Sequence, residues 1–189
     1  METIKLITSN VHKFEEIQVR FSDLGINLEH IQFPYPEAQA ETIRDIAIQS
    51  AATILTYIQP PFLIEDSGIA IEQLKGFPGP YSSFVFKTVG WKGILKLMRD
   101  EKNRKARFIS VIVFIDSFRQ MHVFEGIQEG HIAEEGRGNK GFGFDPIFIP
   151  EGSKLTFAEM DIQTKNEYSH RGKSSGQLYH FLAEKQMKG

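Results

Sequence analysis

Three consecutive segments decide the fold: ARFISVIVFID (residues 106–116), SFRQ (117–120) and MHVFEGIQEGHI (121–132). The two long segments are rich in β-branched and aromatic residues, which favour strands. Because only four residues separate them, they predict an antiparallel hairpin. Upstream, residues 62–64 predict a short buried strand, and residues 69–71 predict its continuation beyond a polar interruption.

Strands and helices alternate in the first part of the chain, whereas the middle is antiparallel. This order predicts an α/β fold with an elongated mixed β-sheet flanked by helices. No repeat or linker divides the 189 residues, so we expect a single domain over 1–189, with room for two lobes. The other predicted strands cover 4–8 and 26–31, and the predicted helices cover about 11–24, 42–57, 93–100 and 173–186.

Composition excludes several classes of protein. A hydrophobic share of 41% with 24% charged residues is enough for a packed core. The net charge of -2 lacks the basic excess of proteins that bind nucleic-acid polymers. Without cysteine, disulfides, thiol nucleophiles and thiolate zinc sites are excluded.

The apolar runs also bear on location. The longest near the middle, residues 111–115, is far short of the ~20 residues that span a bilayer. Residues 1–7 are too short and too quickly polar for a signal peptide. We therefore expect a cytoplasmic protein with no membrane partner.

The first candidate site is TSNVHK (8–13), where a predicted strand passes into a helix. Free N–H groups at a helix start attract anions, and Lys13 would add a positive charge. Simple capping of the helix by Ser9 or Asn10 is the more common explanation of such a segment.

The second candidate site is EDSG (65–68). Adjacent carboxylates are costly to bury unpaired, and such hard oxygen ligands suit Mg²⁺. The alternative is a turn in which Asp66 bonds the backbone ahead of Gly68. Glu37, in a proline-stiffened loop, would supply another carboxylate, although alone it reads as a surface residue.

The third candidate site is the glycine-rich segment 136–146, GRGNKGFGFDP. Its G-x-G-x-x-G is not a dinucleotide fingerprint, because Pro146 blocks the helix that should follow. We expect a loop that presents Phe142 or Phe144 to a flat ligand, with Asp145 accepting a hydrogen bond from it. A loop that is merely anchored by its aromatic residues is the alternative.

The fourth candidate site is KNEYSHRGK (165–173), which holds three cations and a histidine. Positive charge at a helix start is unfavourable for the helix dipole, and functional sites often leave such local conflicts. A solvated basic turn explains the pattern equally well.

Together and in this order, these segments resemble the non-canonical purine nucleoside triphosphate pyrophosphatases, the inosine triphosphatase or Ham1-like family. The resemblance runs from residue 3 to about 183. The motifs that carry it are TSNxxKxxE (8–16), PExQ (36–39), EDSG (65–68), GxPGxYS (76–82), FGFDP (142–146), KN (165–166) and SHR (169–171).

The resemblance implies two lobes around a cleft, a homodimer, and Mg²⁺-dependent cleavage of ITP, dITP and XTP to monophosphate and pyrophosphate. Asp66 would be the general base for the attacking water, and Glu37 and Asp66 would position Mg²⁺ with Glu65 nearby. The residues that would contact the triphosphate are Thr8, Ser9, Asn10 and Lys13.

The resemblance also implies a base site. Phe142 would stack on the base, Ser67 would touch the substrate, and Gly143 and Phe144 of the same loop would also contact the substrate. The residues that would read the base edge are Asp145, Lys165, His170 and Arg171. A 6-keto purine accepts hydrogen bonds from such cations, whereas adenine presents a donor and leaves buried partners unpaired.

Two positions depart from the family pattern. Many members carry a lysine where this chain has Gln49-Ser50, and a lysine or arginine where it has Ser83; Lys87 or Lys173 would have to substitute.

Two other functions stay open. A Maf-like nucleotide pyrophosphatase lacks the FGFDP and SHR motifs. A non-catalytic nucleotide-sensing or RNA-binding module fits poorly with the negative net charge.

Overall fold

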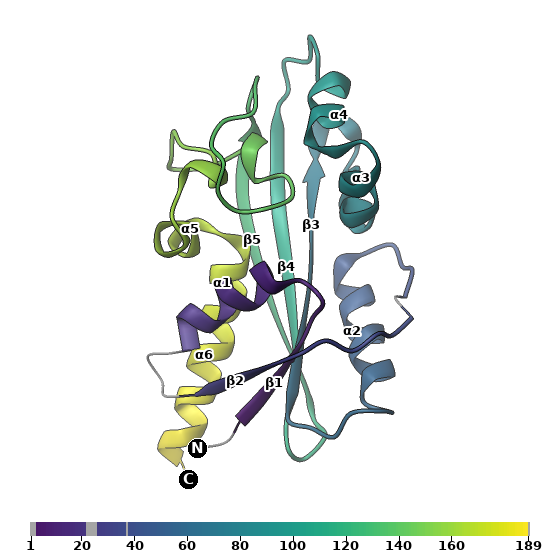
Figure 1. The fold of residues 1–189 in the computed structure, drawn as a ribbon, viewed down its shortest axis with the longest axis vertical. Helices are drawn as coiled ribbons and strands as arrows, with labels where there is room; N and C mark the ends of the chain where they lie inside the picture. Colours follow the sequence, from purple (N-terminus) through teal and green to yellow (C-terminus); the bar gives the residue numbers. More distant parts are fainter. Residues whose placement is uncertain (1–2, 22–25, 37, 189) are drawn as a thin grey trace.

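The computed structural model describes residues 3–21, 26–36 and 38–188. Within them, the strands form one sheet in the order β2-β1-β3-β4-β5-β6 (Figure 1). β1 pairs in parallel with β2 and β3, and the remaining neighbours pair antiparallel. The predicted mixed sheet is therefore confirmed. The strands are β1 (Thr3–Ile7), β2 (Asn27–Ile31), β3 (Phe62–Ile71), β4 (Lys105–Ile115), β5 (Met121–Ile132) and β6 (Phe148–Pro150).

Helices cover both faces of this open sheet. In Figure 1, α1 and α6 lie on one side of the long strands and α2, α3 and α4 on the other. None of the described helices has the length and apolar character needed to cross a membrane. The helices are α1 (Val11–Phe21), α2 (Ile43–Ile54), α3 (Ser82–Thr88), α4 (Gly90–Leu97), α5 (Ile162–Tyr168) and α6 (His170–Lys188).

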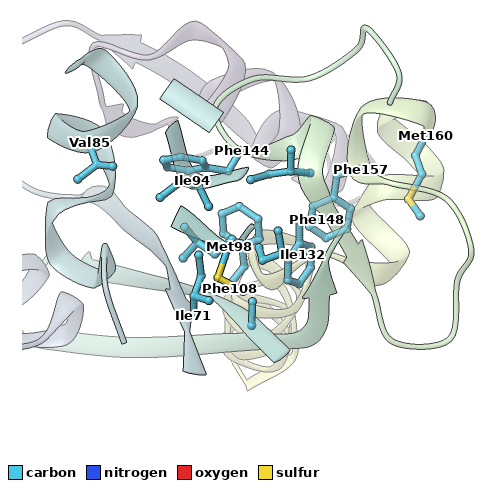
Figure 2. Close-up of a cluster of buried hydrophobic side chains, with 13 residues drawn as sticks. Ile71, Val85, Ile94, Met98, Phe108, Ile132, Phe144, Phe148, Phe157 and Met160 are labelled. Atoms are coloured by element: carbon cyan, nitrogen blue, oxygen red, sulfur yellow. The ribbon is translucent and has the colours of Figure 1, made fainter. Parts of the chain in front are cut away.

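The side chains of β3 alternate between two cores. Leu63 packs with residues of α1 and α6, whereas Phe62 and Ile64 pack with residues of α2. This is the two-residue period of a strand buried on both faces. A third cluster, rich in aromatic side chains, includes Phe108, Phe148 and Phe157 (Figure 2).

The hairpin is confirmed: β4 and β5 pair from Lys105–His131 to Ile115–Met121. The polar interruption in β3 is not a turn, because residues 65–68 pair with residues 112–109 of β4. The turn interpretation of EDSG was therefore wrong. Pairing along both long strands outweighs the local turn preference of Asp and Gly.

Other elements differ from the prediction. α3 and α5 were missed because each has seven residues, and α3 (SSFVFKT) is rich in aromatic and β-branched residues that favour helices weakly. α4 begins and ends three residues earlier than the predicted helix 93–100, and α6 begins at His170 instead of residue 173. The division of one domain into two lobes around a cleft stays a prediction.

Candidate functional site

The N-terminus of α1 follows β1 directly and is capped by its own loop. Asn10 Oδ1 accepts hydrogen bonds from the backbone N–H groups of His12 (3.0 Å) and Lys13 (3.4 Å). Thr8 Oγ1 accepts one from Asn10 N at 3.1 Å, and Ser9 is exposed. The predicted capping is confirmed for Asn10. Phosphate binding by Thr8, Ser9 and Asn10 stays a prediction.

Lys13 joins this helix start to the middle of β3. Its ammonium group lies 2.9 Å from Glu65 Oε2 and donates a hydrogen bond to the Glu65 carbonyl at 3.2 Å. β1 pairs with β3 only opposite Phe62–Ile64, so from Glu65 onward β3 extends beyond β1. The loop 8–10 therefore lies beside the part of β3 that carries the EDSG motif.

Glu65 is a buried carboxylate held by partners on three sides. Ser110 donates to Oε1 at 2.7 Å, and Arg171 Nη2 lies 3.1 Å from the same oxygen. Burial alone would raise the pKa of Glu65, but Arg171 and Lys13 lower it below the ordinary value. Its charge is thus committed to protein cations, so we assign Glu65 to an ion network and not to a metal site.

Asp66 lies on the other face of β3. It alternates with Glu65 and shares the side of Phe62 and Ile64, which face α2. It is partly exposed, and its Oδ1 accepts a hydrogen bond from Ser67 N at 2.8 Å. The two adjacent carboxylates therefore do not converge on one point.

The predicted metal site is consequently reduced to Asp66 and Glu37. Glu37 lies outside the described residues. Across the described ranges, there is no group of three or more His, Asp and Glu side chains that could hold a metal ion by itself. A metal at Asp66 would need ligands from water or a substrate.

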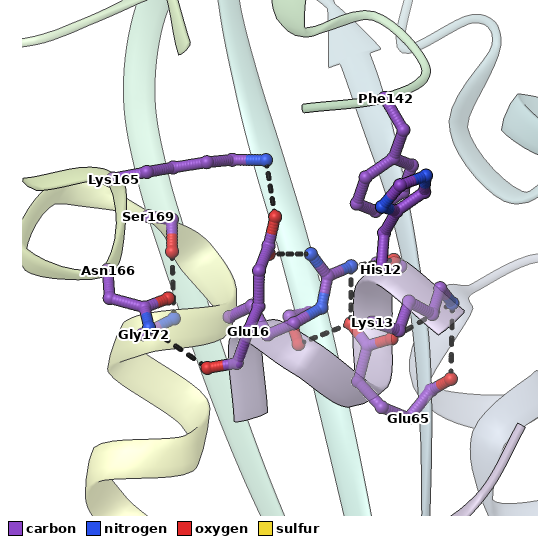
Figure 3. A network of polar contacts seen from close by, with 12 residues as sticks. His12, Lys13, Glu16, Glu65, Phe142, Lys165, Asn166, Ser169 and Gly172 are labelled. Carbon is purple, nitrogen blue, oxygen red and sulfur yellow. Dashed lines mark hydrogen bonds and ion pairs between the residues drawn. The ribbon is translucent and has the colours of Figure 1, made fainter. Parts of the chain in front are cut away.

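The ion network extends from Glu65 through Arg171 to Glu16 of α1 and Lys165 of α5. Figure 3 shows Glu65, Glu16 and Lys165 in place. Glu16 accepts from Lys165 Nζ at 2.7 Å and from Arg171 Nη1 at 2.5 Å. Lys165 Nζ also donates to Asp145 Oδ2 at 2.6 Å. Three carboxylates thus face three cations, because Lys13 pairs with Glu65. Such pairing offsets the cost of burying the charges.

Burial and pairing set the protonation of this network. Burial raises the pKa of Glu16, but Arg171 and Lys165 outweigh it, so the pKa lies below its ordinary value. Burial, opposed by Lys165, raises the pKa of Asp145. Burial would also lower the pKa of Arg171, yet Glu65 and Glu16 raise it. Lys165 and Arg171 are only 3% and 1% exposed, so the solvated basic turn was the wrong interpretation.

Glu16 was not assigned a role from the sequence. Its position three residues after Lys13 places both on one face of α1, which was the available signal. Asn166 Nδ2 donates to the Glu16 carbonyl at 2.9 Å, so α5 is fixed to α1 through its backbone as well.

Phe142 lies against the cations of the network. Its half-buried ring is 5.0 Å from Lys165 Nζ and 5.4 Å from Arg171 Cζ, measured to the ring centroid. Its backbone N–H donates to Asp145 Oδ2 at 2.8 Å. Gly141 allows this bond, because a Cβ there would collide with the Asp145 carboxylate.

Phe144 belongs to the core instead. It is 4% exposed and packs edge-on against Phe86, with centroids 5.6 Å apart. Of the two phenylalanines predicted to meet a ligand, the structure places only Phe142 at the ion network. Gly143, with a φ of 65°, forms the bend between them, and its contact with a substrate stays a prediction.

His170 opens α6 and stacks on Phe108, with centroids 4.6 Å apart. Its pKa lies well below the ordinary value, first because of burial and then because of Arg171. It is therefore neutral near pH 7 and does not act as a cation.

Three buried polar atoms at the start of α6 and in α5 have no hydrogen-bond partner among the described residues. They are His170 Nδ1, Arg171 Nε and Asn166 Oδ1. Buried polar groups are nearly always satisfied, by the protein, by water or by a ligand. Of the three, only Arg171 is in contact with Phe142, so its Nε is the donor available to a ligand on that ring.

The two positions that depart from the family pattern lie in different environments. Ser50 is buried on α2, whereas Ser83 is exposed on α3. Lys87 is exposed four residues after Ser83, hence on the same face of α3. Lys173 already donates to the Ile127 carbonyl at 2.8 Å. The replacement of the missing family cation by Lys87 or Lys173 stays a prediction.

The model of the Ham1 family matches residues 4–181. This chain belongs to the Ham1 family. It is 47% identical over 181 residues to the dITP/XTP pyrophosphatase of Thermococcus kodakarensis, covering 96% of this chain and 97% of the relative. It is 51% identical over 175 residues to the dITP/XTP pyrophosphatase of Korarchaeum cryptofilum, covering 93% of each.

Solved Ham1 structures share the fold over nearly the whole chain. The HAM1 protein from Coxiella burnetii superposes with a TM-score of 0.84 at 32% identity, covering 97% of this chain and 100% of that one. The Staphylococcus aureus Ham1 protein gives 0.82 at 26% identity with the same coverage. The family resemblance stated from the sequence motifs is therefore confirmed.

Proposed function

We propose that this chain hydrolyses non-canonical purine nucleoside triphosphates (dITP, XTP and ITP) to the monophosphate and pyrophosphate. The observation that carries this proposal is the position of Phe142 beside two buried, preorganised cations, Lys165 and Arg171. The names of the curated relatives, dITP/XTP pyrophosphatases, support the same reaction.

The arrangement suits a 6-keto purine. Arg171 is fixed by Glu16, Glu65 and Ser67 through its two Nη groups, and its Nε is left without a partner among the described residues. A guanidinium only donates, so it favours a keto oxygen over the amino group of adenine. The unpaired donors that adenine would leave cost about 1–3 kcal/mol, which corresponds to roughly 5- to 150-fold in affinity.

The phosphates would lie at the start of α1. There the helix dipole and Lys13 attract negative charge, and loop 8–10 offers small polar side chains. A ligand spanning from Phe142 to this loop would pass His12 and Lys13, which are on the first turn of the helix. Lys87 would add a charge from α3.

The residues near Asp66 fit Mg²⁺ only together with substrate. Mg²⁺ commonly takes one or two carboxylates and fills its other positions with phosphate oxygens and water. Asp66 supplies one partly exposed carboxylate, and we propose Glu37 as the second. When bound, the ion would offset negative charge on the phosphates. Glu65 has no place in this set.

We propose Asp66 as the general base that takes a proton from the water attacking the α-phosphorus. A carboxylate base within reach of water typically contributes about 10²–10⁴-fold to the rate. Ser67, whose Oγ accepts a hydrogen bond from Arg171 at 2.9 Å, would touch the substrate between its base and its phosphates.

The experiment is release of pyrophosphate from dITP, XTP, ITP, GTP and ATP, each with and without Mg²⁺. We expect turnover of the first three that depends on Mg²⁺ and exceeds turnover of ATP by at least about tenfold. Equal turnover of ATP and ITP, or no turnover at all, would contradict the proposal. We also propose that the chain forms a homodimer and is located in the cytoplasm. Sedimentation velocity tests the oligomeric state, and cell fractionation tests the location.

A further inference from the structure

His12 connects the two halves of the proposed site. It lies on the first turn of α1, between the capping residue Asn10 and Glu16 of the ion network. Its ring is stacked on Phe142, with centroids 5.4 Å apart and an angle of 13° between the planes (Figure 3). None of the roles proposed above uses this ring.

The two stacked rings differ in how firmly they are held. Phe142 is half-buried, and its backbone is bonded to the buried Asp145. The His12 side chain is 52% exposed, and its Nδ1 lies 3.4 Å from Glu15 Oε2 at the surface, where such contacts hold weakly. Phe142 is therefore a fixed wall, and His12 is free to change rotamer.

The spacing of the rings decides what they can hold. A purine between two rings needs about 3.5 Å on each side, so the rings must stand about 7 Å apart. At 5.4 Å between centroids the pair is too close to admit one. The His12 ring must therefore move before a base can lie on this face of Phe142.

We propose that His12 is a mobile second wall of the base site. It rotates away to admit a purine and then closes on the free face of the base, giving a stack of Phe142, purine and His12. This inference rests on the proposed function, since it assumes a purine substrate. Every base has a π face, so His12 adds affinity for purines of all kinds, while discrimination stays with Lys165 and Arg171.

The test compares His12→Ala, His12→Phe and, as a matched control, Glu15→Ala, which removes the Glu15 contact but leaves the ring. The readouts are kcat and KM for dITP and XTP, and calorimetric binding of dIMP. For His12→Ala we expect KM and the Kd of dIMP to rise about tenfold, at the low end of base stacking, with kcat within about twofold of wild type. His12→Phe and Glu15→Ala should stay near wild type.

Three other results for these variants would overturn the inference. An unchanged KM and Kd in His12→Ala would mean that the ring does not touch the base, and lower values would mean that it competes with the base. Equal losses in His12→Phe and His12→Ala would assign the effect to imidazole hydrogen bonding. If the wild-type protein releases no pyrophosphate, the proposed function is contradicted instead. Binding of dIMP then still tests whether His12 stacks on the base. Thermal melts of all variants separate these effects from unfolding.

Discussion

Glu16 and Arg171 form a buried ion pair, 2.5 Å long, between side chains 155 positions apart in the chain. The bond joins α1 to the first turn of α6 and leaves the guanidinium in one orientation. The same carboxylate holds Lys165 at 2.7 Å. The orientation of both cations that we propose to read the base thus depends on a residue that we do not expect to touch the substrate.

Glu16→Gln should destabilise the fold. The amide keeps the shape but removes the charge that compensates Lys165 and Arg171, and breaking a buried pair costs about 3–5 kcal/mol. Urea denaturation measures the loss. Glu15→Gln, an exposed neighbour on the same helix, is the control and should stay within about 0.5 kcal/mol of wild type. A small loss in both variants would show that the network is not coupled to stability.

Arg171→Lys should relax base discrimination more than it lowers turnover. Lysine keeps the charge that Glu65 and Glu16 require but lacks the planar fork. We expect the ratio of kcat/KM for dITP over dATP to fall about tenfold, within the range of one unpaired buried group. Lys173→Arg is the control, because Lys173 bonds a β5 carbonyl at the surface. An equal fall for both substrates would point to a role at the phosphates.

Asp66→Asn should abolish most of the turnover and leave the fold intact. The side chain is partly exposed, and the asparagine keeps an oxygen that can accept the hydrogen bond from Ser67 N. We expect kcat to fall about 10²–10⁴-fold, with dIMP binding unchanged by calorimetry. Near wild-type kcat with normal Mg²⁺ dependence would rule out Asp66 as the base.

Asp116→Asn should remove a pH-dependent part of the stability. Burial would raise the pKa of Asp116, but hydrogen bonds from His122 (2.9 Å) and Lys185 (3.0 Å) and from the backbone hold it below the ordinary value. The carboxylate therefore stabilises the fold above the unfolded pKa of about 3.9. This contribution is lost as the pH falls through the folded pKa.

The variant should accordingly be about 1.5–3 kcal/mol less stable than wild type at pH 7, and this gap should narrow below about pH 4. Free energies of unfolding at several pH values measure it. Glu184→Gln, exposed on the same helix as Lys185, controls for a change in net charge. A gap that stays constant with pH would mean that packing, not ionisation, is the cause.

The sequence predicted those features that local patterns determine. The β4–β5 hairpin follows from two long strand-forming runs, and capping by Asn10 follows from its position before a helix. Partners far apart in the chain were beyond reach: nothing in the residues around Glu16 indicates a bond to α5 or α6. The adjacent carboxylates of Glu65 and Asp66 were interpreted as one metal site for a related reason. Only the pairing with β4 shows that both residues lie inside a strand, where their side chains point to opposite faces.

The pleat of β3 has a consequence for how this enzyme family can diversify. Glu65 and Ser67 face the ions that would select the base, whereas Asp66, between them, faces the side proposed for hydrolysis. If the proposed roles hold, neighbouring residues of one strand separate the groups that select the base from the carboxylate that activates water. Substitutions on the side of α1 and α6 could therefore change nucleobase preference without altering the face that carries Asp66.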